Sequence, residues 1–310
     1  MYNYLLILLS ALLLTNATLS AQNKLYEKKE ISELNEKANR YLTELQFKES
    51  LLFSREALKR AISIKDDYLI ATAYNTIAGN YDEISENDKA IGNYKKALFF
   101  ATRSKNDTLI GFLNNNLGNM YFFEKKEYKR GLDYYEKALS IAEKTTDTAR
   151  MAFTRLNVAL AYFEVGDYDK GYPHLQFINQ QHAKYGDPTN TVYLHMLNGV
   201  YYGNKNQYDV AETYFQKAIG LAKVSKLDLD LAYTYQEYSK FLKKKGDYES
   251  AYNYFDLYDK LKDSIYDKTK LKSAEVEGIN LELDEYKRAV QRIEAEKEIQ
   301  AMSLQKSEII

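Results

Sequence analysis

Small residues recur through most of the chain at a fixed interval, and this regularity restricts the fold more than any other feature. Each lies among apolar or aromatic residues, and a tyrosine usually follows three positions later. The series is Ala38, Ala78, Gly118, Ala159, Gly199 and Ser239, with successive differences of 40, 40, 41, 40 and 40. A unit repeated at such a period buries its apolar side by stacking on copies of itself. The sequence therefore predicts one uninterrupted array of similar units.

The segment from Ala71 to Ala101 shows what one unit contains. In each of its two halves, small and aromatic residues fall on one face of a helix, and the polar residues 85–88 separate the halves. These residues are Tyr74, Ile77, Ala78 and Tyr81 in the first half and Ala90, Tyr94 and Ala97 in the second. Alanines allow two helix backbones to approach closely, while tyrosines fill the space beside them. Each unit is therefore predicted to be a hairpin of two antiparallel helices.

This pattern resembles the tetratricopeptide repeat (TPR). The resemblance covers about residues 31–260, although the period of 40 is longer than the usual value of about 34. It implies an all-α fold, a right-handed superhelix of six helical hairpins over residues 31–262. Long-period repeats of this kind look like the exported sensory regions of bacterial signalling proteins.

Two turns within the predicted hairpins contain glycine followed by aspartate. They are at Gly166 and Asp167 and at Gly246 and Asp247. Glycine adopts the left-handed conformation that commonly ends a helix, and aspartate is a good N-cap for the next helix. We therefore expect left-handed helix caps at these two glycines.

The first 21 residues differ from the rest of the chain. An apolar run from Leu5 to Leu14 is followed by small and polar residues that end at Ala21. The run is too short for a bilayer core, which takes about 20 residues, and the arrangement is typical of a cleaved signal peptide. An uncleaved anchor is the alternative. We expect residues 22–30 to form a charged lead-in and the protein to be exported, in the periplasm or associated with the cell envelope.

Residues 263–310 form a different C-terminal segment, which is rich in Glu, Lys and Gln. Its apolar residues are spaced 4, 3, 4 and 3 positions apart at Ile279, Leu283, Tyr286, Val290 and Ile293. This spacing is typical of a coiled coil. The segment is therefore predicted to be a long helix that caps the last repeat, forms a homodimer, or does both.

Composition and motifs indicate a binding protein without catalytic activity. The 310 residues include no Cys and carry a net charge of -1, which gives no electrostatic reason to expect a nucleic acid partner. No phosphate-binding loop, metalloprotease motif or nucleophile elbow is present in the sequence. The three histidines lack the spacing of metal ligands. We expect no cofactor and no metal.

The resemblance also implies where a ligand would bind. In TPR arrays the first helices of the hairpins line a concave groove, and the matching positions here are rich in asparagine. The predicted groove residues are Asn75, Asn115, Asn116, Asn119, Asn157, Phe122, Phe163 and Tyr193, with Asn35, Asn39 and Phe153 nearby. An asparagine amide both donates and accepts hydrogen bonds, so a row of them suits the main chain of an extended peptide.

Two functions are compatible with these features. The first is an exported scaffold that binds a peptide or a protein in its groove. The alternative is the sensory module of a histidine kinase or helix-turn-helix regulator, in which the C-terminal coiled coil transmits ligand binding.

Overall fold

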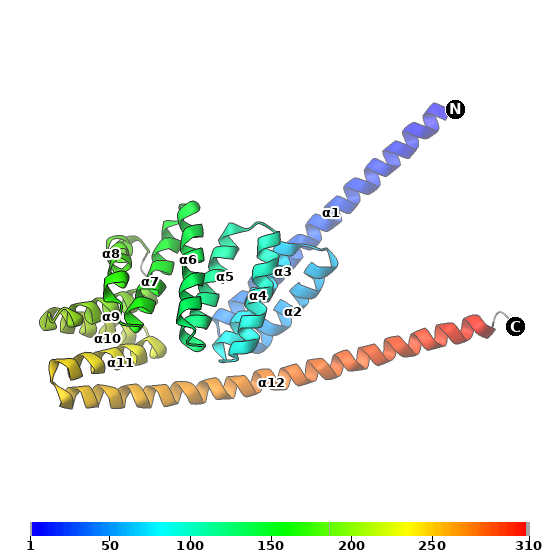
Figure 1. Ribbon diagram of the computed structural model, residues 1–310. Coiled ribbons are helices and arrows are strands. Elements are labelled where there is room, and N and C mark those ends of the chain that lie inside the picture. Colours follow the sequence, from blue (N-terminus) through cyan, green and yellow to red (C-terminus); the bar gives the residue numbers. More distant parts are fainter. Residues whose placement is uncertain (1, 186, 308–310) are drawn as a thin grey trace.

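The computed structural model describes the backbone of residues 2–185 and 187–307 and the side chains of residues 22–181, 187–274 and 276–278. This part of the chain is helical throughout, as predicted, and its elements stand in chain order (Figure 1). The helices are α1 (Tyr2–Thr43), α2 (Phe47–Ser63), α3 (Asp67–Glu83), α4 (Asn87–Arg103), α5 (Asp107–Asn119), η1 (Met120–Glu124), α6 (Tyr128–Lys144), α7 (Thr148–Glu164), α8 (Tyr168–Tyr185), α9 (Pro188–Asn204), α10 (Tyr208–Val224), α11 (Asp228–Lys245) and α12 (Tyr248–Ser307).

These helices pair into six hairpins, here called repeats 1 to 6. Repeat 1 is α1 with α2, repeat 3 is α5 and η1 with α6, and repeat 6 is α11 with the first part of α12. Figure 1 shows the hairpins side by side, with the N-terminal half of α1 projecting from one end and α12 running back along the array. The six predicted hairpins are confirmed.

The predicted segment boundaries do not coincide with the ends of helices. The charged lead-in at residues 22–30 is part of α1, and the boundary at residue 262 falls inside α12. Among the described residues no helix is both long and apolar enough to cross a membrane. The side chains of the predicted signal peptide and coiled-coil seam lie outside the described residues, so both assignments stay predictions.

Two sets of small residues hold each hairpin together. The small residue of every first helix is buried, and so is a second set at the start of every second helix. The second set is Ser50, Ala90, Gly131, Gly171, Ala211 and Ala251. Large side chains pack directly onto these positions. A methyl group built on Gly118 would lie 2.5 Å from the ring of Tyr135, so the contact is as close as the two helices allow.

Aromatic or large apolar residues form a third register, at the centre of the second helices. Tyr94, Tyr135, Leu175 and Phe215 are almost completely buried, because the following repeat covers them. Phe255 occupies the same register in repeat 6 but is 50% exposed. Its side chain packs less completely because no further repeat follows it in the described part of the chain. The outer side of α12 is therefore an uncovered end of the array.

The extra residue in repeat 3 is accommodated by a π-helical turn. The 41-residue interval predicts an insertion between Tyr121 and Tyr128, and the structure widens the end of the first helix at Met120–Glu124. The N–H of Lys125 donates to the carbonyl of Met120, five residues back, at 3.0 Å. A single π turn absorbs one residue without breaking the helix. The insertion thus lies at the end of the first helix as well as in the turn.

Residues in the left-handed conformation end most of the helices, at intervals of 20 or 21 residues apart from the step from Gly166 to Asn206. Gly166 and Gly246 have φ of 78° and 93°, which confirms the two predicted caps. Eight other helix ends use residues that are not glycine in the same conformation. They are Leu45, Lys65, Ser85, Lys105, Lys126, Thr146, Asn206 and Lys226. At each, the next N–H reaches back to a carbonyl of the last helical turn, as from Asn106 to Ala101 at 3.2 Å.

Glycine substituted at these positions is expected to stabilise the protein. Lys105 and Lys226 have φ of 55° and 56° and exposed side chains. A side chain in the left-handed region costs roughly 1–2 kcal/mol, part of which glycine loses to its greater freedom in the unfolded chain. We expect Lys105→Gly and Lys226→Gly each to raise the free energy of unfolding by about 0.5–1 kcal/mol. Urea titrations with the corresponding alanine variants as controls test this, since alanine should give no such gain.

Candidate functional site

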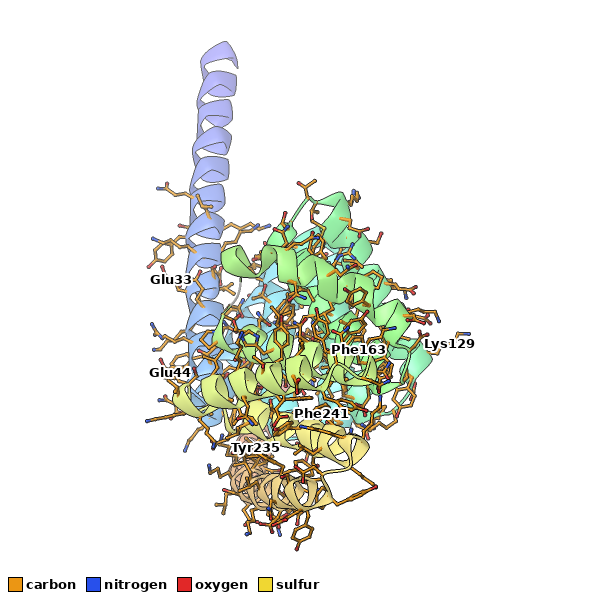
Figure 2. All side chains as sticks on the ribbon, turned by 90° about the vertical axis from the view of Figure 1, so that its left-hand side faces the viewer. Glu33, Glu44, Lys129, Phe163, Tyr235 and Phe241 are labelled. Atoms are coloured by element: carbon orange, nitrogen blue, oxygen red, sulfur yellow. The ribbon has the colours of Figure 1, made fainter. Side chains whose placement is uncertain are left out.

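The first helices of the six repeats form one layer, here called the inner face. Helix α1 contacts α3, and α9 contacts both α7 and α11. The second helices form the other layer. Figure 2 shows Phe163 and Phe241 among the packed helices, whereas Glu33, Glu44 and Lys129 lie at the periphery. The predicted groove residues on α3, α5, α7 and α9 can be located within this layer.

Three asparagines occupy the same position on the first helices of repeats 1 to 3, 40 residues apart. They are Asn35 on α1, Asn75 on α3 and Asn115 on α5. The Nδ2 of Asn35 donates to the carbonyl of Leu69 at 3.3 Å. The Oδ1 atoms of Asn35 and Asn75 and the Nδ2 of Asn115 are buried and have no hydrogen-bond partner among the described residues. An unpaired buried amide atom costs about 1–3 kcal/mol, so a row of three is unusual for purely structural asparagines.

The other predicted asparagines differ in their availability. Asn157 donates to the Oδ1 of Asn115 at 3.0 Å, so these two side chains form one unit across α7 and α5. Asn115 is only 1% exposed, whereas Asn116 and Asn157 are partly exposed. Asn119 accepts a hydrogen bond of 2.6 Å from the hydroxyl of Tyr135. Asn119 is therefore engaged with the repeat core, and Asn75, Asn115, Asn116 and Asn157 remain as the asparagine cluster of the inner face.

The two predicted phenylalanines do not reach the surface of the inner face. Phe122 is completely buried and packs onto the backbone of Gly131, and Phe163 packs onto Gly171 in the same way. Both belong to the contact between the two helices of their hairpin. Resemblance alone could not distinguish a groove position from this neighbouring core position. A ligand in the groove would therefore not contact either ring.

Tyr193 lies partly exposed on α9 and is bonded to the next repeat. Its hydroxyl and that of Thr189 donate hydrogen bonds to the carboxylate of Asp230, in the first turn of α11. Burial nevertheless raises the pKa of Asp230 to about 6. This contact joins repeats 5 and 6.

The titration of Asp230 should make part of the stability depend on pH. Because the pKa is raised in the folded state, the stabilising effect of protonation is complete below about pH 4 and is lost as pH rises through about 6. We expect Asp230→Asn to gain about 1 kcal/mol relative to the wild type between pH 5 and pH 7. Urea titrations of both proteins at the two pH values measure this difference. A constant difference would contradict it.

His174 makes a contribution of opposite sign to the pH dependence of the stability, and the comparison of the wild type with Asp230→Asn removes it. The pKa of His174 is lowered to about 4 by burial and by the nearby Arg155. Its contribution is complete above about pH 6.5 and is lost as pH falls toward 4. This term is present in both proteins, so it cancels in their difference.

Carboxylates at the ends of the first helices were not among the predicted groove residues. Glu83, Glu124 and Glu164 end α3, η1 and α7, at intervals of 41 and 40 residues. Burial raises the pKa of Glu83, and the charges of Glu124 and Glu164 both help to raise that of Tyr233 on α11. The C-terminal ends of the first helices of repeats 2, 3 and 4 therefore each carry a glutamate. The regular spacing of these residues is a signal that could have identified them in the sequence.

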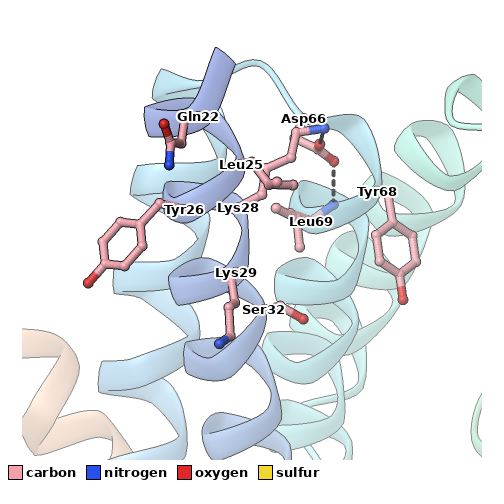
Figure 3. Close-up of a pocket in the computed structure, with 9 residues that line it drawn as sticks. All are labelled: Gln22, Leu25, Tyr26, Lys28, Lys29, Ser32, Asp66, Tyr68 and Leu69. Carbon is pink, nitrogen blue, oxygen red and sulfur yellow. Dashed lines mark hydrogen bonds and ion pairs between the residues drawn. The ribbon is translucent and has the colours of Figure 1, made fainter. Parts of the chain in front are cut away.

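A separate hollow lies between α1 and α3, at the N-terminal end of the array (Figure 3). Its volume is about 860 Å³, and Leu25, Tyr26 and Tyr68 expose apolar surface there. The ammonium of Lys28 lies 2.6 Å from the carboxylate of Asp66, which also caps α3 through the N–H of Leu69. These two charged groups therefore neutralise each other at the edge of the hollow.

Comparison with known proteins identifies the repeat type. The sequence model of the tetratricopeptide repeat family matches residues 109–171, and a second model of that family matches residues 194–224. These parts of the array are tetratricopeptide repeats. The two matches cover TPR hairpins in repeats 3 to 5, where the small-residue registers contain Gly118, Ala159 and Ala211. No curated protein matches the full sequence.

Solved structures show the same TPR solenoid. Aspartyl phosphate phosphatase F from Bacillus subtilis has a TM-score of 0.64 at 16% identity, over 76% of this chain and 60% of the phosphatase. The apo form of RapI gives 0.63 at 17% identity, over 80% of this chain and 85% of RapI. The Rap conjugation gene regulator of the plasmid pLS20, in complex with the Phr* peptide, gives 0.55 at 14% identity, over 75% and 73%. At these identities the likeness establishes the fold.

Proposed function

We propose that the protein is a non-catalytic, exported TPR scaffold that binds an extended peptide or protein segment on its inner face. The observation that carries the proposal is the row of unpaired amide atoms on Asn35, Asn75 and Asn115. Peptide N–H and C=O groups are the complementary partners for such atoms. Rotation of these side chains toward a bound main chain would satisfy amide atoms that are buried without a partner in the unliganded protein.

The similar structures support this choice of ligand. The pLS20 regulator was solved in complex with a peptide, which shows that a solenoid of this shape accommodates one. The asparagine cluster also lies on the first helices, where TPR arrays present their concave surface. For this chain the peptide would extend across α3, α5 and α7 and meet partly exposed Asn75, Asn116 and Asn157.

Substituting Asn75 and Asn115 by alanine is expected to weaken peptide binding by about 10- to 100-fold. Each main-chain hydrogen bond contributes about 0.5–1.5 kcal/mol, and the Asn115 substitution also releases Asn157 from its partner. A peptide is first selected from a random-sequence display library on the full chain. Its dissociation constant for the wild type and the double variant is then measured by titration calorimetry.

Asn93→Ala is the matched control for this experiment. Asn93 lies on the second helix α4, and its Nδ2 donates to the carbonyl of Lys89 at 2.8 Å. The selected peptide should bind this variant as tightly as the wild type. Equal affinity of the Asn75 and Asn115 double variant would instead show that the asparagine cluster does not contact the ligand.

Export rests on the apolar run at Leu5 to Leu14 and the small residues before Gln22. We propose cleavage near Ala21, with the mature protein in the periplasm or at the cell envelope. Intact mass and cell fractionation test this. The proposal predicts the mass of residues 22–310 in the envelope fraction, and an uncleaved chain in the cytosol would contradict it.

We propose that two copies associate through α12. Phe255 is half exposed although its equivalents Tyr135 and Phe215 are completely buried, so this helix presents a core-type side chain to solvent. Tyr248 and Tyr252 extend the same exposed surface, being 69% and 70% exposed. Light scattering should give the mass of a dimer for the full chain and of a monomer for Phe255→Glu. A monomeric wild type would exclude this interface.

A further inference from the structure

Helix α12 connects the last repeat to the first. Near its middle, the ammonium of Lys268 lies 3.3 Å from the carboxylate of Asp228, at the start of α11. Two turns further on, α12 contacts α2. Figure 1 shows this course, from beneath α11 to beneath α2. Together with the repeats between them, α12 therefore closes a ring.

Among the described side chains, the contact with the first two repeats has two parts. Val276 is 1% exposed and belongs to the apolar cluster that contains Phe47 and Leu51 of α2. The ammonium of Lys272 lies 5.1 Å from the centre of the Phe47 ring. Its charge also acts on Glu83 at the end of α3, where it offsets part of the rise in pKa that burial causes. Among the described side chains of α12, one apolar group and one ammonium thus hold the far side of the ring.

The ring encloses one edge of the inner face. Lys272 of α12 lies over Phe47, which begins α2 just after the end of α1, and acts on Glu83, which ends α3. Helix α12 therefore crosses the array at the C-terminal ends of the first helices, the edge to which Glu124 and Glu164 of repeats 3 and 4 also belong. Lysines of α12 and the carboxylates of the array have opposite charges, which favours the closed arrangement at low ionic strength.

We propose that residues 268–276 of α12 are a releasable strap that controls access to the inner face. Docked on α2, the strap closes the ring against large molecules, and its release from Phe47 and Glu83 opens the ring. Release of Val276 and Lys272 from α2 and α3 leaves the repeats folded, so it requires less free energy than global unfolding. The proposal deepens the peptide-binding function, since it states how the ligand reaches its site and how occupancy would be passed to the C-terminal end of α12.

The chain contains no cysteine, so access can be measured with single introduced thiols. Glu124→Cys places one on the enclosed edge, and Lys137→Cys places a control thiol on exposed α6. Each is alkylated in the full chain with N-ethylmaleimide and with a 5-kDa polyethylene glycol maleimide, with and without Val276→Asp. These measurements need no peptide, so their failure is distinguishable from failure of the proposed binding function.

The strap predicts that Val276→Asp changes the ratio of the two alkylation rates at one of the two thiols. The ratio of large-reagent to small-reagent rates at residue 124 should rise about tenfold with Val276→Asp, because burying a carboxylate against Phe47 is unfavourable. The same ratio at residue 137 should not change. An unchanged ratio at residue 124 would overturn the proposal.

A distance measurement shows whether the substitution has released the strap. Spin labels at Lys48→Cys on α2 and Glu277→Cys on α12 should give one narrow distance distribution, which becomes longer and broader with Val276→Asp. Both native side chains are exposed. An unaltered distribution would show that Val276 does not hold α12 on α2, which also contradicts the proposal.

Discussion

A single methyl group added at Gly131 is expected to lower the free energy of unfolding by about 3 kcal/mol. Gly131 begins the second helix of repeat 3, against the π-helical end of the first. A methyl group there would lie 2.5 Å from the Cβ of Phe122, 2.8 Å from its backbone nitrogen and 2.9 Å from its Cα. These atoms cannot rotate away, so the two helices must separate, and the burial of Phe122 is lost with them.

Urea titration of Gly131→Ala measures this effect, and Gly92→Ala is its control. Gly92 lies within α4, and a methyl group there would have no heavy atom within 4 Å. Alanine at that position should raise stability by up to about 1 kcal/mol, because it favours the helix. If both variants were equally stable, close packing at Gly131 would not determine the geometry of repeat 3.

The second large effect is expected for Phe215→Ala, which should cost about 3–5 kcal/mol. Phe215 is completely buried and packs against Gly199, with rings of Tyr238 and Phe241 at centroid distances of 5.0 and 5.3 Å. Its removal leaves a cavity between repeats 5 and 6. Because each repeat is stabilised mainly by its neighbours, the loss should also increase hydrogen exchange in α11 and the first part of α12.

Phe255→Ala is the matched comparison, since it deletes the same side chain from the same register of the next repeat. Phe255 is half exposed, so its removal transfers less apolar surface to water and should cost about 1 kcal/mol in the monomer. Thermal or urea unfolding of both variants distinguishes the two positions. Equal costs would mean that the following repeat does not provide the burial of Phe215.

The sequence predicts the fold well because the fold depends on a repeated local pattern. Buried small residues such as Ala78 and Gly199 recur at the period of the hairpin, and their spacing alone reveals the number of repeats. The left-handed caps are different. Gly166 and Gly246 could be identified because glycine favours that conformation, whereas Lys105 in the same conformation has no distinguishing residue type.

The candidate site was only partly predictable. Asn75 and Asn115 could be found because they share a register, but Asn119 is engaged with Tyr135, which no repeat pattern indicates. Phe122 lies in the core of its hairpin, one helical step from the groove. Sequence spacing predicts which helix carries a residue. Neighbouring positions on that helix point about 100° apart, so an error of one position exchanges a ligand contact for a core contact. The contact of the strap with α2 joins residues that are far apart in the sequence, so no local sequence pattern predicts it.

Photo-crosslinking tests the central claim most directly, because it reports which face of the solenoid contacts the peptide. A photoreactive phenylalanine analogue replaces either Phe153 on α7, in the inner layer, or Phe99 on the second helix α4. Both native side chains are exposed, at 37% and 58%. With the selected peptide, the inner-face account predicts a crosslinked product at residue 153 and none at residue 99. Crosslinking at residue 99 alone would place the ligand on the second helices and contradict the account.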